Sequence, residues 1–371
     1  MVSSTSAGRA PHAAPRPRTL LWVGMSVGLA ALLVLVALLT EGVSEDTAPA
    51  PAAPGAARSH GSHRRSVTDF VKAATKAPEV RPNRSRVLVR GAWGSAPGQF
   101  GRLRAEESNP EAPMSLAVDG QGTLSVLDQV NRRVQRFDRS GKLVGTVPIR
   151  SETVQDIAVQ GDRTFLLDRL GGEPGVEILD SAGRSVERLP AVGGAVKEGG
   201  AITGLFPRGS AVYVENEHDD LVRVGGAGEE TIPGRPSRDG RLYLKAGIID
   251  KTAGRIYVQA HNQSDRGLAW ETPLNLGRPL LHLLLLDSDR SGRVYVAAEV
   301  GQEDPQTHAF HDLATLVIRL TPEGRLDGVL TLPPTTAGAA ETFRPLAVGD
   351  DGTIYHMLAT EAGLQVTAHS F

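Results

Sequence analysis

Carboxylate and imidazole side chains follow several short apolar runs in this sequence, and both groups bind cations and transfer protons. They occur in the stretches DQVNR, DRLGGEPG, ENEHDD, HNQSD and AAEVGQEDPQTHAFHDLA. If the fold gathers these stretches at one opening, their side chains form a candidate ligand site. The candidates are Asp128, Asp168, Glu215, His218, His261, Glu299, His308 and His311.

A structural role for the same residues is the competing interpretation. An aspartate directly after a strand often caps the turn by accepting hydrogen bonds from backbone N–H groups. This applies to Asp128 and Asp168, which end the second apolar run of their units. Histidines and acids in loops also belong to an ordinary solvated surface.

The sequence offers little support for several other kinds of chemistry. The chain has no H-x-x-x-H or H-E-x-x-H motif, which are patterns of metalloproteases, and the serine hydrolase pattern G-x-S-x-G occurs only as GMSVG inside the apolar run Thr19–Leu39. It has no cysteine, which excludes disulfides, thiolate metal sites and a cysteine nucleophile. The formal net charge is -2, so no global basic field predicts a nucleic-acid partner.

The elements that must position the candidates are visible in PMSLAVDGQGTLSVLDQVNRRVQRFDRSGKLV, from Pro113 to Val144. Short apolar runs alternate there with tight turns of Gly, Asp, Asn and Ser, which predicts β-hairpins. The pattern of apolar run, turn and β-rich run returns five times. These segments are Asp156–Asp168, Gly204–Asn216, Ala246–Ala260, Leu283–Glu299 and Pro345–Ala359.

The spacing of the six hairpins predicts a β-propeller. Their markers are Val126, Leu166, Val214, Tyr257, Tyr295 and Tyr355. The intervals are about 40–50 residues, with one wider interval, and this period fits four strands per blade. No 3.6-residue periodicity supports a helical solenoid in these windows, and an up-and-down barrel has no recurring four-strand unit. We therefore predict an all-β fold, a six-bladed β-propeller at residues 85–371.

The last unit is too short to complete its own blade. After YHMLA only one further strand fits, at Leu364–Ser370, and the run RVLVRGAW at Arg86–Trp93 supplies the missing outer strand. This pairing closes the ring and leaves no open blade to fray. In such a ring the turns after the second strands open at one end, where we expect the candidate residues to converge.

Two segments in the fifth unit depart from the average unit. The run Leu280–Asp287 is predicted as an inner strand buried on both faces, with His282 in the core or lining the channel. The wider interval contains Ala298–Ala314, which we predict as a long loop. Loops of this length are binding loops, lids or tolerated surface insertions.

One part of the chain resembles a known repeat. The stretch GAWGSAPGQFGRL at Gly91–Leu103, with the following NRRVQRF and DRSGK motifs up to Val144, is similar to the NHL repeat. Later units keep less of the pattern, such as DIAV, LLD, VEILDSAGR and RLTPEGRL. The resemblance implies a six-bladed propeller, and propellers of this type are binding platforms, scaffolds or, less often, enzymes.

The N-terminal region predicts attachment to a membrane. The run Thr19–Leu39 has no charged residue and is long enough for a helix to span a bilayer, which takes about 20 residues. A cleaved signal peptide is the alternative, although its apolar core is normally about 7–15 residues. Arginines precede the run and acids follow it, which places the N-terminus in the cytoplasm.

These boundaries divide the chain into four parts. Residues 1–18 are a cytoplasmic tail, residues 19–40 a transmembrane anchor, residues 41–84 a disordered Pro/Ala-rich linker, and residues 85–371 the extracytoplasmic propeller, periplasmic or extracellular. The linker is long and flexible enough to let the propeller sample its surroundings.

Three functions follow as hypotheses. The first is a module that binds an envelope protein, peptide or glycan with one propeller face. The second is an enzyme that resembles the gluconolactonase-like six-bladed hydrolases. That resemblance implies a divalent cation held by carboxylates and an Asn, with candidates Glu215, Asn216, Asn262 and Glu299. The third is a structural scaffold for an envelope complex. No other cofactor is predicted.

Overall fold

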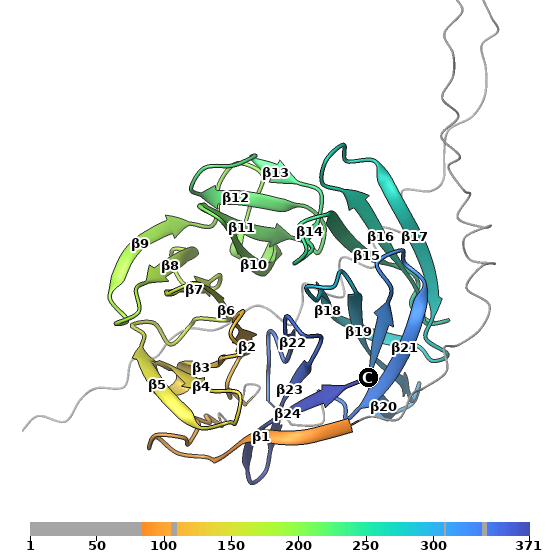
Figure 1. Cartoon of the computed structure of the whole chain (residues 1–371). Coiled ribbons are helices and arrows are strands. Elements are labelled where there is room, and N and C mark those ends of the chain that lie inside the picture. Colours follow the sequence, from red (N-terminus) through yellow and green to blue (C-terminus); the bar gives the residue numbers. More distant parts are fainter. Residues whose placement is uncertain (1–83, 105–109, 308, 336–339) are drawn as a thin grey trace, which may run out of the picture. The chain divides into compact units, whose positions relative to one another are not determined.

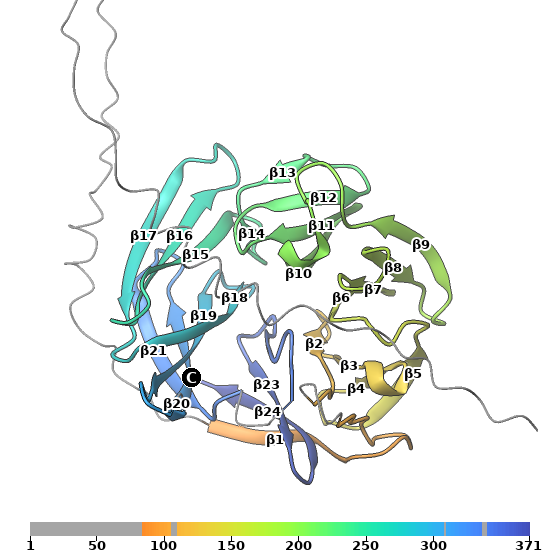
Figure 2. The same ribbon diagram turned by 180° about the vertical axis from the view of Figure 1, so that it is seen from behind.

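The described part of the chain forms a ring of six four-stranded antiparallel sheets in this computed structural model. The structure describes residues 84–104, 110–307, 309–335 and 340–371. Figure 1 shows the sheets arranged as blades around a common axis, and Figure 2 shows the same ring from behind. The topology confirms the predicted all-β, six-bladed propeller.

The strands of the first three blades follow the chain in order from the axis outward. Blade 1 contains β2 Ser115–Val118, β3 Leu124–Asp128, β4 Arg133–Phe137 and β5 Leu143–Pro148. Blade 2 contains β6 Asp156–Gln160, β7 Arg163–Asp168, β8 Gly175–Leu179 and β9 Ser185–Pro190. Blade 3 contains β10 Ile202–Arg208, β11 Ala211–Asn216, β12 Leu221–Gly225 and β13 Thr231–Ile232. Two short 3-10 helices precede strands: η1 Gln129–Asn131 and η2 Gly199–Ala201.

The remaining blades include the strand exchange between the two ends of the ring. Blade 4 contains β14 Arg235–Pro236, β15 Leu242–Asp250, β16 Arg255–Asn262 and β17 Leu268–Asn275. Blade 5 contains β18 Leu280–Ser288, β19 Val294–Glu303, β20 Phe310–Leu320 and β21 Leu326–Leu332. Blade 6 contains β22 Leu346–Val348, β23 Ile354–Thr360, β24 Gly363–Ser370 and, as its outer strand, β1 Arg84–Ala92.

Aspartate-based turns explain why many hairpins form where the sequence predicts them. In the β2–β3 turn, one carboxylate oxygen of Asp119 accepts hydrogen bonds from the N–H groups of Gln121 and Thr123, at 2.9 and 2.8 Å. Gly122 follows with φ +79°, a conformation that costs a glycine little. The same paired bonds recur at Asp138, Asp180 and Asp289, so a local motif sets the hairpin pitch around the ring.

The ring closes by the predicted pairing of the first and last strands of the domain. β1 runs antiparallel to β24 from Arg84 opposite Ser370 to Ala92 opposite Gly363, with one bulge. Blade 1 then packs on β1: a Cβ at Gly141 would lie 1.8 Å from the carbonyl oxygen of Leu88. Only glycine permits this approach of the β4–β5 turn to the closing strand.

The hydrophobic core is divided among the interfaces between neighbouring blades. Each pair of adjacent blades shares one cluster of buried aliphatic and aromatic side chains. The cluster between blades 3 and 4 is the smallest and consists of Ala211, Tyr213, Leu221, Ile232 and Tyr243. It lies where β13 and β14 are only two residues long. The ring is therefore least regular at this interface.

The strand positions predicted for blade 4 are wrong by one strand. The hairpin Ala246–Ala260 was expected to join the first and second strands of its unit, but it joins β15 and β16, the second and third. The first strand is the short β14, at Arg235–Pro236. Turn chemistry marks a hairpin without saying which two strands of a blade it joins, and this produced the error.

The segment Ala298–Ala314 is also different from the prediction. Most of it continues β19 and β20 as a long hairpin, with Gln302 opposite His311 and Glu303 opposite Phe310. It is therefore not a long loop. In β18, His282 is exposed and several neighbours are only half-buried, so this strand is not buried on both faces as predicted.

The anchor predicted at residues 19–40 lies outside the described residues, and so does the linker predicted at residues 41–84, except for Arg84, which begins β1. Within the described residues, none of the helices has the length and apolar character needed to span a bilayer. The four domain boundaries therefore stay predictions.

Candidate functional site

The two ends of the ring differ in which turns they carry. Face A carries the turns between second and third strands, and face B carries the turns between first and second strands. Asp128, Asp168, Glu215, Asn216 and His218 lie at or beside second-to-third turns, on face A. Glu299 in β19 and His311 in β20 lie toward the same face.

Three of the predicted residues do not join this group. His261 and Asn262 end β16, the third strand of blade 4, and therefore lie on face B. The backbone N–H of the adjoining Gln263 donates to the carbonyl of Arg241 in the β14–β15 segment, which confirms that these turns share one end. His308 is outside the described residues. The ligand-binding assignment of all these residues stays a prediction.

The two aspartates on face A are held in turns by internal hydrogen bonds. Asp128 accepts from the N–H of Gly101 at 2.8 Å, from Asn131 at 3.0 Å and from Arg133 at 2.8 Å. Asp168 accepts from the N–H of Gly171 at 2.9 Å and from two hydroxyls of the preceding loop. Both carboxylates therefore have the turn-capping geometry that the sequence offers as the alternative to ligand binding.

Three arginines near the axis connect blades that are far apart in sequence. Arg235 pairs with Glu215 of blade 3 at 2.6 Å and donates to the carbonyl of Leu286 in blade 5. Arg344, which precedes blade 6, pairs with the buried Asp156 of blade 2 at 2.5 Å. Side chains of blades 2, 3 and 4, a backbone carbonyl of blade 5 and the segment before blade 6 thus meet near the axis.

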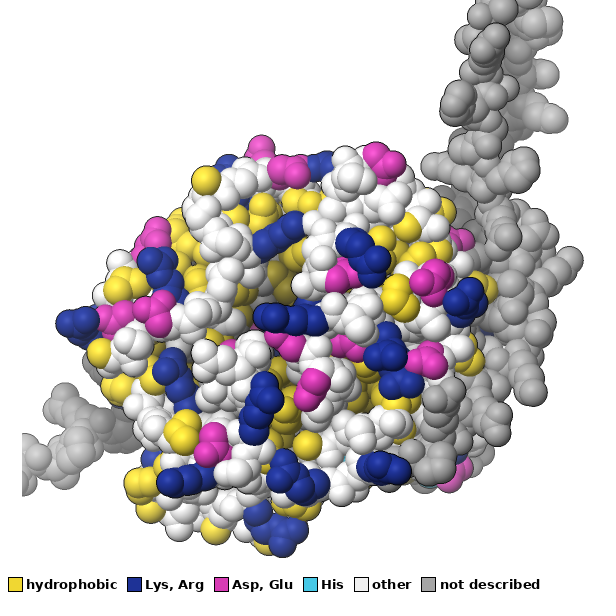
Figure 3. Space-filling model, viewed as in Figure 1, with side chains coloured by type: hydrophobic (Ala, Val, Ile, Leu, Met, Phe, Trp, Pro, Cys, Tyr) yellow, Lys and Arg dark blue, Asp and Glu magenta, His cyan; other side chains and the backbone are white. Residues whose placement is uncertain are grey.

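The third arginine closes the same region toward face B. Arg238, in the β14–β15 turn, pairs with Asp287 at 2.8 Å and with Asp350 at 3.1 Å. It also donates to the carbonyl of Val348 at 2.7 Å. Figure 3 shows acidic and basic side chains interspersed about the centre of one face, without a large field of one sign.

Phe206 of β10 fills the space between two of these arginines. The guanidinium carbons of Arg235 and Arg344 lie 5.1 and 5.4 Å from the centre of its ring. Cation–π contacts of this kind stabilise by about 0.5–2 kcal/mol, depending on desolvation. Arg235, Arg344 and Phe206 therefore form one contiguous layer, which we call the axial layer.

Glu215 is the carboxylate of this layer that the sequence singles out. Its side chain is 2% exposed. Burial acts to raise the pKa of Glu215, but the charge and hydrogen bonds of Arg235 outweigh burial, with help from His218, and the pKa is lowered. Glu215 is therefore an ionised partner of a buried cation, and its two oxygens are occupied by Arg235, Thr203 and His218.

We expect Glu215→Gln to destabilise the folded chain by about 2 kcal/mol, because Arg235 would remain buried without a counter-charge. Urea unfolding followed by circular dichroism measures this change. The matched control is Glu217→Gln, two residues later and exposed, for which we expect a change within about 0.5 kcal/mol. Equal stability of the two variants would contradict the pairing.

The β11–β12 turn presents His218 on face A in a strained backbone conformation. Glu217 and His218 have φ values of 52° and 62°, a left-handed pair that glycine or asparagine normally occupies. The N–H of Glu217 donates to the carbonyl of Ala201, and the N–H of His218 donates to the hydroxyl of Thr203. The imidazole is 60% exposed, and its Nδ1 lies 3.4 Å from Glu215 Oε2. The buried carboxylate thus orients an exposed imidazole.

Blade 4 leaves part of its second strand uncovered on face A. β14 pairs only with Tyr243 and Leu244 of β15, and no described strand pairs with the axial edge of β15 beyond that point. The second strands of the other blades are mostly buried, but residues 245–250 of β15 are half-buried or exposed. Ile248 is 51% exposed.

The hydrogen bonds of β15 identify the backbone groups at this open edge. The carbonyl of Leu242 accepts from Ser237 on the β14 side, and the carbonyl of Arg241 accepts from Gln263 on the β16 side. Backbone groups alternate between the two edges of a strand. Ala246 and Ile248 therefore direct their N–H and C=O groups to the open edge, where no described residue bonds to them.

The β11–β12 turn and the start of β18 lie on either side of the unpaired edge of β15. Lys245 of β15 pairs with Asp219 and Asp220, which fixes the β11–β12 turn against β15. On the other side, the N–H of Leu280 at the start of β18 donates to the carbonyl of Lys251 at 2.8 Å. We name the opening bounded by β15, the start of β18 and the β11–β12 turn the β15 opening.

The four residues proposed to hold a cation are not brought together. Glu215 pairs with Arg235, Asn262 lies on face B, and Glu299 is buried in β19, where it accepts from Thr335. Asn216 ends β11. In the part of the chain that the structure describes, no three Asp, Glu or His side chains are close enough to hold a metal ion. The cation site therefore stays a prediction without a described geometry.

The fold defines the chain as a six-bladed β-propeller, and solved structures with a similar arrangement include proteins of different functions. A gluconolactonase of Xanthomonas campestris is 15% identical, with 80% of this chain and 96% of that chain covered and a TM-score of 0.41. A DUF4221 family member of Bacteroides vulgatus is 11% identical, with 79% and 97% covered and a TM-score of 0.43.

The virginiamycin B lyase of Staphylococcus aureus is a further example. It is 10% identical, with 78% of this chain and 100% of that chain covered and a TM-score of 0.39. Likenesses this weak carry no argument about function. No family model and no curated protein matches the sequence.

Sequence reasoning missed the arginines of the axial layer and the β15 opening. Arg235, Arg238 and Arg344 lie in polar segments between hairpins, and their partners are distant in sequence. One signal was present: only the pair Arg235–Pro236 stands between Gly234 and the turn at Ser237, too little for a full first strand.

Proposed function

We propose that this chain is a membrane-anchored, extracytoplasmic β-propeller of the NHL type that binds an envelope protein. The bound element is an extended peptide segment of that protein, which pairs with the axial edge of β15 on face A. The observation that carries the proposal is the uncovered edge at Ala246 and Ile248. The anchor at residues 19–40, the linker at residues 41–84 and the NHL type are supported by the sequence patterns.

An extended peptide is the occupant that fits the chemistry of the β15 opening. Unpaired N–H and C=O groups at a strand edge are a template for an additional strand, whose main chain supplies the missing donors and acceptors. Ile248 continues the row of Leu242, Leu244 and Ala246, which packs toward blade 5. The exposed side chain of Ile248 offers an apolar contact to a peptide side chain on the same face of the added strand.

Charge around the opening favours a peptide over a polyanion. Lys245 is already neutralised by Asp219 and Asp220, and the layer below contains paired arginines and carboxylates. Backbone pairing supplies affinity without a surface of uniform charge. The side chains at alternate positions of the peptide supply specificity.

The test uses full-length protein in detergent micelles and a displayed library of random peptides of about ten residues, the upper length of ordinary strands. Selected peptides are then measured against Ala246→Pro, which removes one N–H at the open edge. We expect at least about tenfold weaker binding to Ala246→Pro, because one backbone hydrogen bond is lost and the pyrrolidine ring of proline hinders the pairing of an added strand. Ala246→Ser keeps the N–H and is the matched control.

Two outcomes would contradict the proposal. One is a set of selected peptides that bind Ala246→Pro and Ala246→Ser equally well. The other is hydrogen exchange that the peptides slow elsewhere on the ring but not at residues 245–250. The melting temperatures of both variants are compared with that of the parent chain, since substitution at an open edge leaves the internal ladder intact.

A further inference from the structure

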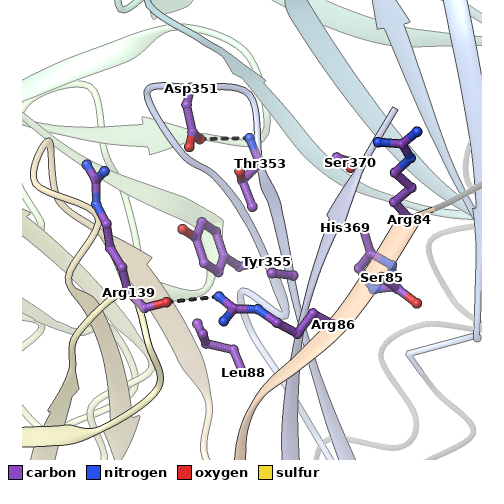
Figure 4. Close-up of a pocket in the computed structure, with 11 residues that line it drawn as sticks. Arg84, Ser85, Arg86, Leu88, Arg139, Asp351, Thr353, Tyr355, His369 and Ser370 are labelled. Atoms are coloured by element: carbon purple, nitrogen blue, oxygen red, sulfur yellow. Dashed lines mark hydrogen bonds between the residues drawn. The ribbon is translucent and has the colours of Figure 1, made fainter.

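A cavity lies away from blade 4, at the seam where the ring closes. It has a volume of about 370 Å³ and lies between β1, the adjacent strands of blade 6 and the β4–β5 turn of blade 1. Figure 4 shows its lining residues, which come from β1, β23, β24 and two turns. We name it the seam pocket. This volume is in the range of small-molecule sites.

The walls of the seam pocket carry an excess of positive charge. Arg84 and Arg86 extend from β1 and Arg139 extends from the β4–β5 turn, and Asp351 is the one acid among the described residues of the lining. Arg86 donates to the backbone carbonyl of Arg139 at 2.9 Å, and Arg139 donates to the backbone carbonyl of Gln121 at 2.5 Å. These bonds use few of the five N–H donors that each guanidinium carries.

The arginines of the seam pocket belong to those described arginines that have no acidic partner. Some other exposed arginines do pair with acids, as Arg132 does with Glu152 and Arg325 with Glu323. Within the described residues, no acid pairs with Arg84, Arg86 or Arg139. Like charges gathered around a cavity repel one another, so an anion between them is favoured.

Two side chains, Leu88 and Tyr355, give the seam pocket an apolar surface. Leu88 and the ring of Tyr355 are buried below the arginines. Figure 4 shows the Tyr355 hydroxyl directed toward the side of the pocket where Arg139 and Asp351 lie. Burial, followed by the nearby Asp351, raises the pKa of Tyr355, so the phenol keeps its proton and can donate it in a hydrogen bond.

We infer that the seam pocket binds a small organic oxyanion, in which a phosphate or carboxylate group meets the arginines and a compact apolar body rests on Leu88 and Tyr355. Guanidinium groups match both oxyanions through paired N–H donors. The ligand would contact β1, β24 and blade 1 at once. Because those contacts exist only in the closed ring, binding stabilises the closure.

The experiment measures full-length protein in detergent micelles by calorimetric titration and thermal unfolding at constant ionic strength. The probes are phenyl phosphate, benzoate and phenol, which share a ring and differ in the charged group. We expect phenyl phosphate or benzoate to raise the melting temperature by about 3–6 °C at about 100 times its dissociation constant. Phenol, without a charge, is expected to have no effect. Whichever oxyanion binds more tightly identifies the class of ligand.

Substitutions connect the effect to the seam pocket. Arg84→Gln and Arg139→Gln are exposed changes, and each is expected to weaken oxyanion binding at least about tenfold. Arg325→Gln, in a turn of blade 5, is the matched control and is expected to leave binding unchanged. Oxyanions without effect on the parent chain, or equal binding by the Arg84→Gln/Arg139→Gln double variant, would overturn the inference.

Discussion

A chain that lacks residues 84–92 is expected to lose the cooperative unfolding transition of the propeller. The deletion removes β1, and with it the ladder to β24 and the buried side chains Leu88 and Val89. Blade 6 would then have an open edge, and the β4–β5 turn would lose the strand on which Gly141 packs. Circular dichroism during heating measures this loss.

A single substitution tests the same closure with less disruption. Val89→Asp places a charge at a site that is 3% exposed and is expected to cost at least about 4 kcal/mol of unfolding free energy. Val87→Asp is the matched control on the same strand, since Val87 is 42% exposed. A deletion variant that still melts in one sharp transition near the parent temperature would show that β1 is dispensable.

Acid is expected to destabilise the propeller through two buried histidines of blade 6. His356 in β23 is fully buried, and its ring centre lies 6.0 Å from that of His369 in β24. Burial lowers the pKa of His356 to about 3, with the neighbouring His369 as the second cause. Burial also lowers the pKa of His369 to about 4. The two histidines therefore bind protons less readily in the folded state than in the unfolded chain.

The direction of the pH dependence follows from this difference. Stability is fully present above the ordinary histidine pKa of about 6.5 and is lost as the pH falls toward 3. From His356 alone we expect a loss of about 3 kcal/mol between pH 7 and pH 4. His369 acts in the same direction. Urea unfolding at several pH values measures the loss.

Substitutions separate the histidine effect from the titration of acids elsewhere. His356→Leu removes the titrating group from an apolar interface and is expected to flatten the pH dependence by the amount assigned to His356. His282→Leu is the control, because His282 is exposed on β18. An unchanged pH dependence in His356→Leu would remove the histidine pair from the explanation of acid sensitivity.

The ring and its closure were predictable because interactions between residues close in sequence determine the hairpins. Aspartates such as Asp119 and Asp138 form their turns with residues two and four positions later, so the sequence itself contains the whole motif. The strand at Arg86–Trp93 was assigned by counting what the last blade lacked. Both inferences needed only short-range patterns and the closure of a ring.

The candidate site was less predictable because its contacts are long-range. Glu215 stands three residues before His218, but the cation that fixes its role is Arg235, which is distant in sequence. In the same way, Arg344 reaches Asp156 from the other end of the domain. The β15 opening has no motif, because it depends on the lack of a pairing strand beside Ala246 among the described residues. An irregularity of this kind appears only when every hairpin has been assigned to its place in a blade.

Hydrogen exchange of the free chain tests the central claim, that blade 4 leaves the axial edge of β15 open, most directly. Site-resolved measurements on the unliganded protein compare the amides of Ala246 and Ile248 with those of Val126 and Leu166 in complete second strands. Exchange is expected to be at least about 100-fold faster at Ala246 and Ile248, because no described backbone partner protects them. Equal protection at all four amides would contradict it.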